Sequence, residues 1–271
     1  MLPLVDKPLI QFCVEECVAS GITHVIIVTG RGKSAIEDHF DFAPELEQFL
    51  ADKGKTDLAA QVRALGSMAE VSYIRQREPR GLGHAVLTAK ELVGNEPFVV
   101  LLGDVIIQSE KPATLQLIDV YNATGQGAIA VEPVPFEQTY LYGVIKPAAN
   151  PSTTPPMPSR IAERLVAIED LVEKPKREDA PSNLIVTGRY LLPPEIFEYL
   201  GRTTAGSGGE IQLTDSMRLL AKEKGLWAYR YEGVCYDAGD KLGFLKATVE
   251  FGLRNAELGP AFRAYLKSLK F

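Results

Sequence analysis

Two aspartates stand where this sequence could hold a hard cation. Asp104 follows a glycine at the end of the apolar run 97–102, and Asp237 lies in the string Cys-Tyr-Asp-Ala-Gly-Asp. Mg²⁺ prefers oxygen ligands and needs only one or two protein carboxylates when phosphates and water complete its shell. The pair therefore indicates a magnesium site that would neutralise phosphate charge. Capping of a helix that starts near Lys241 is the competing role, and we favour the metal for Asp237 and the cap for Asp240.

A glycine-rich turn could let a ligand approach the backbone closely. The string Gly81-Leu-Gly-His-Ala follows an apolar run and opens a helix, whose N-terminus favours anionic or electron-rich groups. Gln76, at the end of that run, offers one acceptor and two donors that can match the edge of a uracil. Taken alone, these residues are explained as well by a plain turn and a solvated glutamine. His84 fits a structural role, because phosphoryl-type transfers need little acid–base help.

A charged pair ends another apolar run in the second half of the chain. Glu173 and Lys174 precede a proline there. A glutamate can bind two sugar hydroxyls, and a lysine can bind a phosphate as a point charge. A surface salt bridge is the competing explanation for so short a string.

These side chains need elements that bring strand ends together. Continuous apolar runs typical of buried strands alternate with helical periods in the first half of the chain. We expect strands at 24–29, 71–75, 97–102 and 127–131, and helices at 9–20, 44–66, 81–92 and 114–122. This order predicts a doubly wound α/β sheet, in which ligands bind at the carboxyl ends of the strands. Gln76, Gly81 and Asp104 all fall just past such ends.

The second half is less regular but continues the pattern. Strands are expected at 142–146, 165–172, 184–192 and 227–232, and helices at 194–200, 210–224, 240–255 and 260–269. The segment 147–159 holds five prolines and is predicted to be an exposed loop, because strand signals resume on both sides. In the helix expected at 44–66, periodicity places four residues inside: Leu46, Phe49, Leu50 and Leu58.

Composition excludes several classes of protein. The 271 residues carry a formal net charge of −6 and no dense Lys/Arg cluster, which argues against a nucleic-acid partner. No apolar run approaches the ~20 residues that span a bilayer, and no signal peptide is recognisable, so we expect no membrane contact and a cytoplasmic location. The three cysteines lack disulfide spacing, and Cys13 and Cys17 are predicted to be buried small hydrophobes.

Together, the motifs are similar to those of a known family. In chain order they are Leu-Pro-Leu-Val-Asp-Lys-Pro (2–8), Gly-Leu-Gly-His-Ala (81–85), Gly-Asp-Val (103–105), Tyr-Gly-Val (142–144), Val-Glu-Lys-Pro (172–175), Pro-Ser-Asn-Leu (181–184), Gly-Arg-Tyr (188–190), Gly-Glu-Ile-Gln-Leu-Thr-Asp (209–215) and Asp-Ala-Gly-Asp-Lys-Leu-Gly (237–243). Over essentially the whole chain the sequence resembles bacterial UDP-glucose pyrophosphorylases, in the sugar nucleotidyltransferase family, and the last two strings are the most specific. The resemblance implies one domain over 1–271 with a Rossmann-like mixed sheet of the nucleotide-diphospho-sugar transferase type.

The resemblance also implies a reaction. In it, glucose 1-phosphate attacks the α-phosphorus of UTP in the presence of Mg²⁺, releasing pyrophosphate and leaving UDP-glucose. By matching motif, Asp104 would hold the Mg²⁺ with help from Asp237. Gln76 and Gly81 would meet the uracil.

The sugar side of the site is implied in the same way. Gly143 and Glu173 would hold the glucose hydroxyls, and the backbone near Val186 would complete that pocket. Lys174 would contact the phosphate of the sugar, which makes Asp104 and Lys174 the catalytic groups. Members of the family are commonly homodimers or homotetramers, and we expect the same here.

Two departures from the family pattern affect these expectations. The family's first strand and its loop of the form Gly-x-Gly-Thr-Arg are expected immediately before the position of Met1, so the sheet is expected to lack both. Since that loop carries an Arg and a Lys that stabilise the triphosphate, we expect weak or no transferase activity from these 271 residues alone. At Gly103 the glucose/UTP branch has proline. The alternatives are a non-catalytic nucleotide-sugar-binding or regulatory homologue, and a thymidylyltransferase or other sugar-1-phosphate nucleotidyltransferase.

Overall fold

The centre of the molecule is a six-stranded mixed sheet. The computed structural model describes residues 1–149, 157–204, 206 and 209–270. The sheet has the order β5-β10-β7-β11-β9-β8. Its strands are β5 (Phe98–Leu101), β7 (Ala128–Pro133), β8 (Gly143–Pro147), β9 (Leu165–Glu173), β10 (Leu184–Leu192) and β11 (Trp227–Arg230). The pair β7–β11 is parallel, whereas the neighbouring pairs in that order are antiparallel, so the predicted mixed α/β sheet is confirmed.

Helices cover both faces of this sheet. Along β7, Ile129 and Val131 point into one core, and Ala128 and Ala130 point into the other, which is the two-residue period of a strand. The first core is closed by α5 (Leu82–Thr88), α9 (Ile196–Arg202) and α10 (Leu213–Glu223), and the second by α7 (Ala113–Thr124). The doubly wound arrangement follows from this alternation, because each face of the sheet is apolar.

Three shorter pairings lie outside the six-stranded sheet. The parallel pair consists of β3 (His24–Thr29) and β4 (Glu70–Arg75), as expected for continuous apolar runs. The antiparallel pair consists of β6 (Val105–Gln108) and β12 (Val234–Asp237), which the sequence patterns did not predict. A small hairpin joins β1 (Pro3–Leu4) to β2 (Lys7–Pro8).

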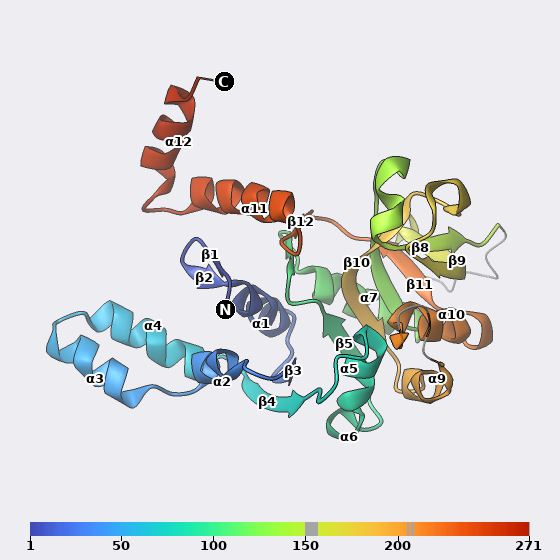
Figure 1. Cartoon of the computed structure of the whole chain (residues 1–271), viewed down its shortest axis with the longest axis horizontal. Helices are drawn as coiled ribbons and strands as arrows, with labels where there is room; N and C mark the ends of the chain where they lie inside the picture. The colour runs from blue at the N-terminus through green and yellow to red at the C-terminus, as the bar shows by residue number, and fades with distance from the viewer. Residues whose placement is uncertain (150–156, 205, 207–208, 271) are drawn as a thin grey trace.

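The helix predicted at 44–66 is two helices. They are α3 (Pro44–Asp52) and α4 (Thr56–Gly66), and between them Gly54 takes a left-handed φ of 71° that ends the first helix. The two form a hairpin that stands away from the central sheet, at the left of Figure 1. Leu46, Phe49 and Leu58 are exposed there, so the prediction that they lie inside is wrong. A helical period fixes which residues share a face, but not whether another element covers that face.

The remaining elements agree with the expected pattern or lie in its gaps. They are α1 (Leu9–Ala19), α2 (Ser34–Phe40), α6 (Lys90–Val93), α8 (Ser159–Ala162), α11 (Lys241–Arg254), α12 (Gly259–Ser268) and the 3₁₀ turns η1 (Phe136–Leu141) and η2 (Arg177–Asp179). Of the loop predicted at 147–159, residues 150–156 lie outside the described residues. Within the part of the chain that the structure describes, no helix is long and apolar enough to cross a membrane.

Gly243 sets how closely α11 approaches β12. A Cβ at this position would overlap the carbonyl oxygen of Asp237. Gly243→Ala is therefore expected to lower the free energy of unfolding by about 1–3 kcal/mol or more, because α11 must move away. Gly201→Ala in α9, where a Cβ meets nothing within 4 Å, is the matched control and should not destabilise the protein. Thermal unfolding measures both variants, and equal melting temperatures would contradict this packing.

Candidate functional site

The two predicted metal ligands lie side by side. In the β6–β12 pair, Asp237 is opposite Val105, and the N–H of Ala238 donates to the carbonyl oxygen of Asp104 at 2.8 Å. A Cβ at Gly239 would lie 2.9 Å from Asp104 Oδ2 and 3.1 Å from Asp237 Oδ1. The two carboxylates therefore face one small space, which exists because residue 239 has no side chain.

This pair fits the needs of Mg²⁺ when the ligand supplies phosphates. Asp104 is exposed and Asp237 is half-buried, so both can be reached. Among the described residues, no group of three or more His, Cys, Asp or Glu side chains is gathered in a way that could hold a metal by itself. Two carboxylates are sufficient for Mg²⁺ when phosphate oxygens and water complete its octahedron.

Tyr142 and Gly239 orient the carboxylate of Asp237. The N–H of Gly239 donates to Oδ1 at 2.9 Å, and the phenol of Tyr142 lies 3.4 Å from Oδ2. Burial, together with the charge of Asp237, raises the pKa of Tyr142 to about 12, so the phenol remains a donor at neutral pH. Sequence reasoning gave Tyr142 no role of its own, although it begins one of the motifs that carry the resemblance.

Three residues predicted for the sugar meet at one point. Gly143 on β8 is the cross-strand partner of Glu173 on β9. A Cβ at Gly143 would lie 3.2 Å from Glu173 Oε2, 3.5 Å from Thr214 Oγ1 and 3.7 Å from Val186 Cγ2. The prediction for Gly143, Glu173 and Val186 is therefore consistent with their positions, and Thr214 joins them.

Thr214 is the polar residue of this cluster that the sequence did not single out. Its hydroxyl donates to Glu173 Oε2 at 2.6 Å, and it lies at the start of α10. Such a bond holds the carboxylate in one orientation and leaves lone pairs for other donors. The signal was present, because Thr214 lies within the specific string at 209–215, but only the fold shows which side chain it meets.

Lys174 connects the sugar side to the carboxylate pair. It has a left-handed φ of 44°, which is uncommon for a residue with a side chain, and its N–H donates to the carbonyl oxygen of Tyr142 at 3.0 Å. Since the phenol of Tyr142 contacts Asp237, the segment that carries Glu173 and Lys174 is tied to the segment that carries the metal ligands. Backbone strain of this kind is found preferentially at functional sites.

The residues predicted for the base form a turn packed on the 209–215 string. The amide nitrogen of Gln76 lies 3.1 Å from the carbonyl oxygen of Gly81 and 2.9 Å from His84 Nδ1, in agreement with a structural role for this histidine. Gly81 has a φ of 91°, and a Cβ there would lie 2.9 Å from the carbonyl oxygen of Ile211. The N–H of Gly83 donates to the same oxygen at 2.8 Å. The turn therefore requires glycine both for its conformation and for its packing.

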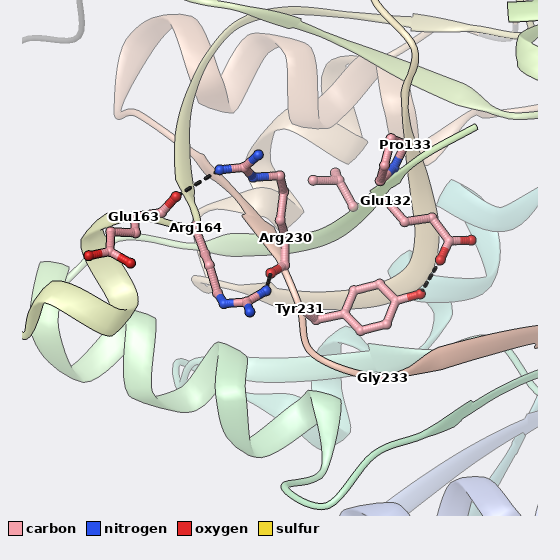
Figure 2. A pocket seen from close by; sticks show the side chains of 8 residues that line it. Glu132, Pro133, Glu163, Arg164, Arg230, Tyr231 and Gly233 are labelled. Carbon is pink, nitrogen blue, oxygen red and sulfur yellow. Dashed lines mark hydrogen bonds between the residues drawn. The ribbon is translucent and has the colours of Figure 1, made fainter. Parts of the chain in front are cut away.

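A separate hollow of about 510 Å³ contains none of the predicted site residues (Figure 2). It lies at the C-terminal ends of β7 and β11. Its polar groups are bonded to one another: Arg230 donates to the Glu163 carbonyl oxygen at 2.7 Å, Arg164 to the Arg230 carbonyl oxygen at 3.1 Å, and Tyr231 to Glu132 Oε2 at 2.6 Å. The glycine-lined clusters are therefore the candidate site, because the chemically suited side chains converge there.

Comparisons with known proteins define the class of this fold and site. Residues 1–251 match the family model described as nucleotidyl transferase, so the chain belongs to the nucleotidyl transferase family. Within it, the chain is 48% identical to UTP–glucose-1-phosphate uridylyltransferase of Staphylococcus epidermidis over 269 residues, which cover 99% of this chain and 90% of that protein. It is 47% identical to the enzyme of the same name from Bacillus subtilis, over 99% of this chain and 88% of the relative.

Solved structures agree with these relatives. The fold matches the UTP-bound UDP-glucose pyrophosphorylase from Acinetobacter baumannii with a TM-score of 0.87 and 38% identity, over 100% of this chain and 91% of that one. It matches a UDP-glucose pyrophosphorylase complexed with UDP-glucose with a TM-score of 0.80 and 39% identity, over 93% and 89% of the two chains. The fold predicted from the sequence is thus the fold of these enzymes.

If the carboxylate pair binds a divalent cation, removing either charge should weaken that binding. Asp104→Asn and Asp237→Asn are each expected to weaken the binding of Mn²⁺ alone by about tenfold or more, equivalent to about 1.4 kcal/mol, because each removes one of two charged ligands. Electron paramagnetic resonance titration of Mn²⁺ measures this directly. Asp240→Asn is the matched control: Asp240 accepts from the N–H groups of Leu242 and Gly243, and asparagine caps a helix equally well. If Asp104→Asn and Asp237→Asn bind Mn²⁺ as tightly as Asp240→Asn and the unaltered protein do, the site is refuted.

Proposed function

We propose that this chain is a UTP–glucose-1-phosphate uridylyltransferase. In the proposed reaction a phosphate oxygen of glucose 1-phosphate attacks the α-phosphorus of UTP, the bond to the leaving pyrophosphate breaks, and UDP-glucose forms. The observation that carries the proposal is the connection between two clusters. Glu173 and Gly143 on the sugar side are connected through Lys174 and Tyr142 to the carboxylate of Asp237, which would face the phosphates. The similarity to uridylyltransferases over 99% of the chain supports the same proposed activity.

Mg²⁺ is the metal we propose for Asp104 and Asp237. When bound, it would neutralise the phosphate charge that develops as pyrophosphate leaves. The side chains present do the positioning: Asp237 is held by Tyr142 and Gly239, and Asp104 by the backbone bond of its carbonyl to Ala238. Positioning and charge neutralisation are the main demands of this transfer, because UTP already carries a good leaving group.

The substrates would be recognised from two sides. We propose that Glu173, oriented by Thr214, accepts hydrogen bonds from the glucose hydroxyls, and that Lys174 contacts the sugar phosphate. The amide nitrogen of Gln76 is held by Gly81 and His84, and its amide oxygen can accept a hydrogen bond from the N–H on the uracil edge.

We also propose that the chain is a homodimer or homotetramer, as the family resemblance implies. Exposed apolar side chains on one side of α11, namely Leu242, Leu245 and Val249, are compatible with a covered surface. Sedimentation velocity of the purified chain tests this, and a monomer at micromolar concentration would contradict it.

Glu173 is expected to select the sugar. Glu173→Ala should weaken the binding of glucose 1-phosphate far more than that of UTP, since each lost charge-assisted hydrogen bond is worth roughly 1.5–3 kcal/mol. Calorimetric titration with each substrate measures the difference. Glu169→Ala on the same strand is the control, because Glu169 is half exposed and pairs with Lys146 at the surface. Equal losses for both substrates in Glu173→Ala would count against the assignment.

Turnover separates the proposed function from its alternatives. With the family's Gly-x-Gly-Thr-Arg loop supplied in front of residue 1, UTP with glucose 1-phosphate should release pyrophosphate faster than dTTP or other sugar 1-phosphates. In that protein, Asp104→Asn should slow the release by about a hundredfold or more. UDP-glucose binding should be measured in parallel. Tight binding without turnover would indicate a non-catalytic nucleotide-sugar-binding protein, and faster turnover of dTTP would indicate a thymidylyltransferase.

A further inference from the structure

Arg189 is a charged side chain inside the fold. It lies in an irregular stretch of β10, where the step of four positions from Val186 to Tyr190 matches a step of two positions, from Val131 to Ile129, along β7. Its side chain is 1% exposed. A guanidinium taken out of water is tolerated only when it is paired and fully hydrogen-bonded. The partners of Arg189 therefore indicate what the buried charge does.

Two of these partners bracket the turn that carries Asp104. Arg189 Nη2 donates to the carbonyl oxygen of Val105 at 2.8 Å, and Nη1 donates to that of Leu102 at 3.4 Å. The residues between those carbonyls are Gly103 and Asp104. One rigid planar group thus holds both ends of the turn.

Glu16 on α1 completes the pairing. Arg189 Nε lies 3.1 Å from both carboxylate oxygens of Glu16, and Nη2 lies 2.9 Å from Oε2. Glu16 Oε1 also accepts from the backbone N–H of Thr114 at 3.0 Å and from its hydroxyl at 2.7 Å. Glu16 therefore ties the guanidinium to α1 and to the start of α7.

A buried thiol contributes to the same turn. Cys13, one turn before Glu16 on α1, lies 3.5 Å from the Leu102 carbonyl oxygen. Burial raises the pKa of Cys13 to about 11, so the thiol is a neutral donor. Cys13 and Cys17 are both buried, as the sequence predicted.

We propose that the Glu16–Arg189 pair is a positioning device for Asp104. It fixes the turn Leu102–Val105 so that the carboxylate of Asp104 faces Asp237 before a cation arrives. Neither side chain is a ligand; both act through the backbone of the turn, while Ala238 holds the same turn from β12. A ligand that is already in place loses less freedom on binding, and the pair therefore raises affinity for the cation. This inference rests on the magnesium site of the proposed function.

Arg189→Lys tests the positioning role. Lysine keeps the charge, but a point-like ammonium cannot span two carbonyls and a carboxylate at once. With Mn²⁺ alone as the probe, the variant is expected to bind roughly 10–100-fold more weakly, as is typical when a residue that orients a metal ligand is changed. The paramagnetic resonance line shape of the bound Mn²⁺ should also change. Melting temperature is recorded for every variant.

Two controls separate positioning from general stability. Val120→Ala removes buried apolar atoms from α7, and is expected to lower the melting temperature and leave Mn²⁺ affinity unchanged. Arg218→Lys disturbs a different two-contact pair, with Asp170, and should also bind Mn²⁺ like the unaltered protein. If Val120→Ala loses Mn²⁺ affinity to the same extent as Arg189→Lys at a similar melting temperature, the positioning role is overturned.

Two further variants, Glu16→Gln and Asp104→Asn, separate the positioning role of the ion pair from the magnesium site itself. Glu16→Gln keeps the size of the side chain and an acceptor for Thr114, and should reproduce the loss of affinity if Arg189→Lys fails to fold. Normal Mn²⁺ affinity in a folded Arg189→Lys or Glu16→Gln protein, with Asp104→Asn impaired, overturns the positioning role and leaves the magnesium site standing. Normal affinity in Asp104→Asn overturns the magnesium site, and the positioning role with it.

Discussion

The buried ion pair between Arg189 and Glu16 joins parts of the chain that strand pairing alone does not hold together. Its charges are satisfied only when α1, the start of α7, β10 and the turn before β6 take one arrangement. In a medium of low polarity, leaving one partner unpaired costs about 3–5 kcal/mol, which disfavours arrangements that separate the two charges. The direction of β6 follows from that turn, and β6 in turn places β12 and Asp237. The geometry of the carboxylate pair thus depends on a contact made on the other side of the turn.

Three glycines, which have no side chain, define the space of the site as much as the surrounding side chains do. Gly239 leaves room between the two aspartates, Gly143 leaves room beside Glu173, and Gly81 lets the turn at the base side lie against Ile211. Each glycine is at a point where a Cβ would touch a polar atom of a neighbouring element. A ligand can therefore approach both carboxylates and backbone closely, as phosphates and sugars require.

Hydrogen bonds connect the three clusters into one unit. The carboxylate of Asp237 contacts the phenol of Tyr142, and the carbonyl oxygen of Tyr142 accepts from the N–H of Lys174. Glu173 accepts from the hydroxyl of Thr214, which belongs to the string 209–215. In that string, the carbonyl oxygen of Ile211 accepts from the N–H of Gly83 in the glycine-rich turn. Groups held in this way need little rearrangement when a substrate binds, which is the main requirement of a transfer whose leaving group is already activated. The structural role of His84 fits such a site, since acid–base chemistry contributes little to it.

The sequence by itself determined the elements whose signal is local. The strand at 184–192, the alternation of strands and helices, and the helix cap at Asp240 follow from periods and residue types within a few positions. The motifs also marked most residues of the candidate site. Tertiary structure alone decided that β6 pairs with β12, that Thr214 meets Glu173, that Arg189 supports the turn of Asp104, and that Phe49 is exposed. These facts depend on contacts between residues far apart in the chain, and a local period carries no information about which element will cover a face.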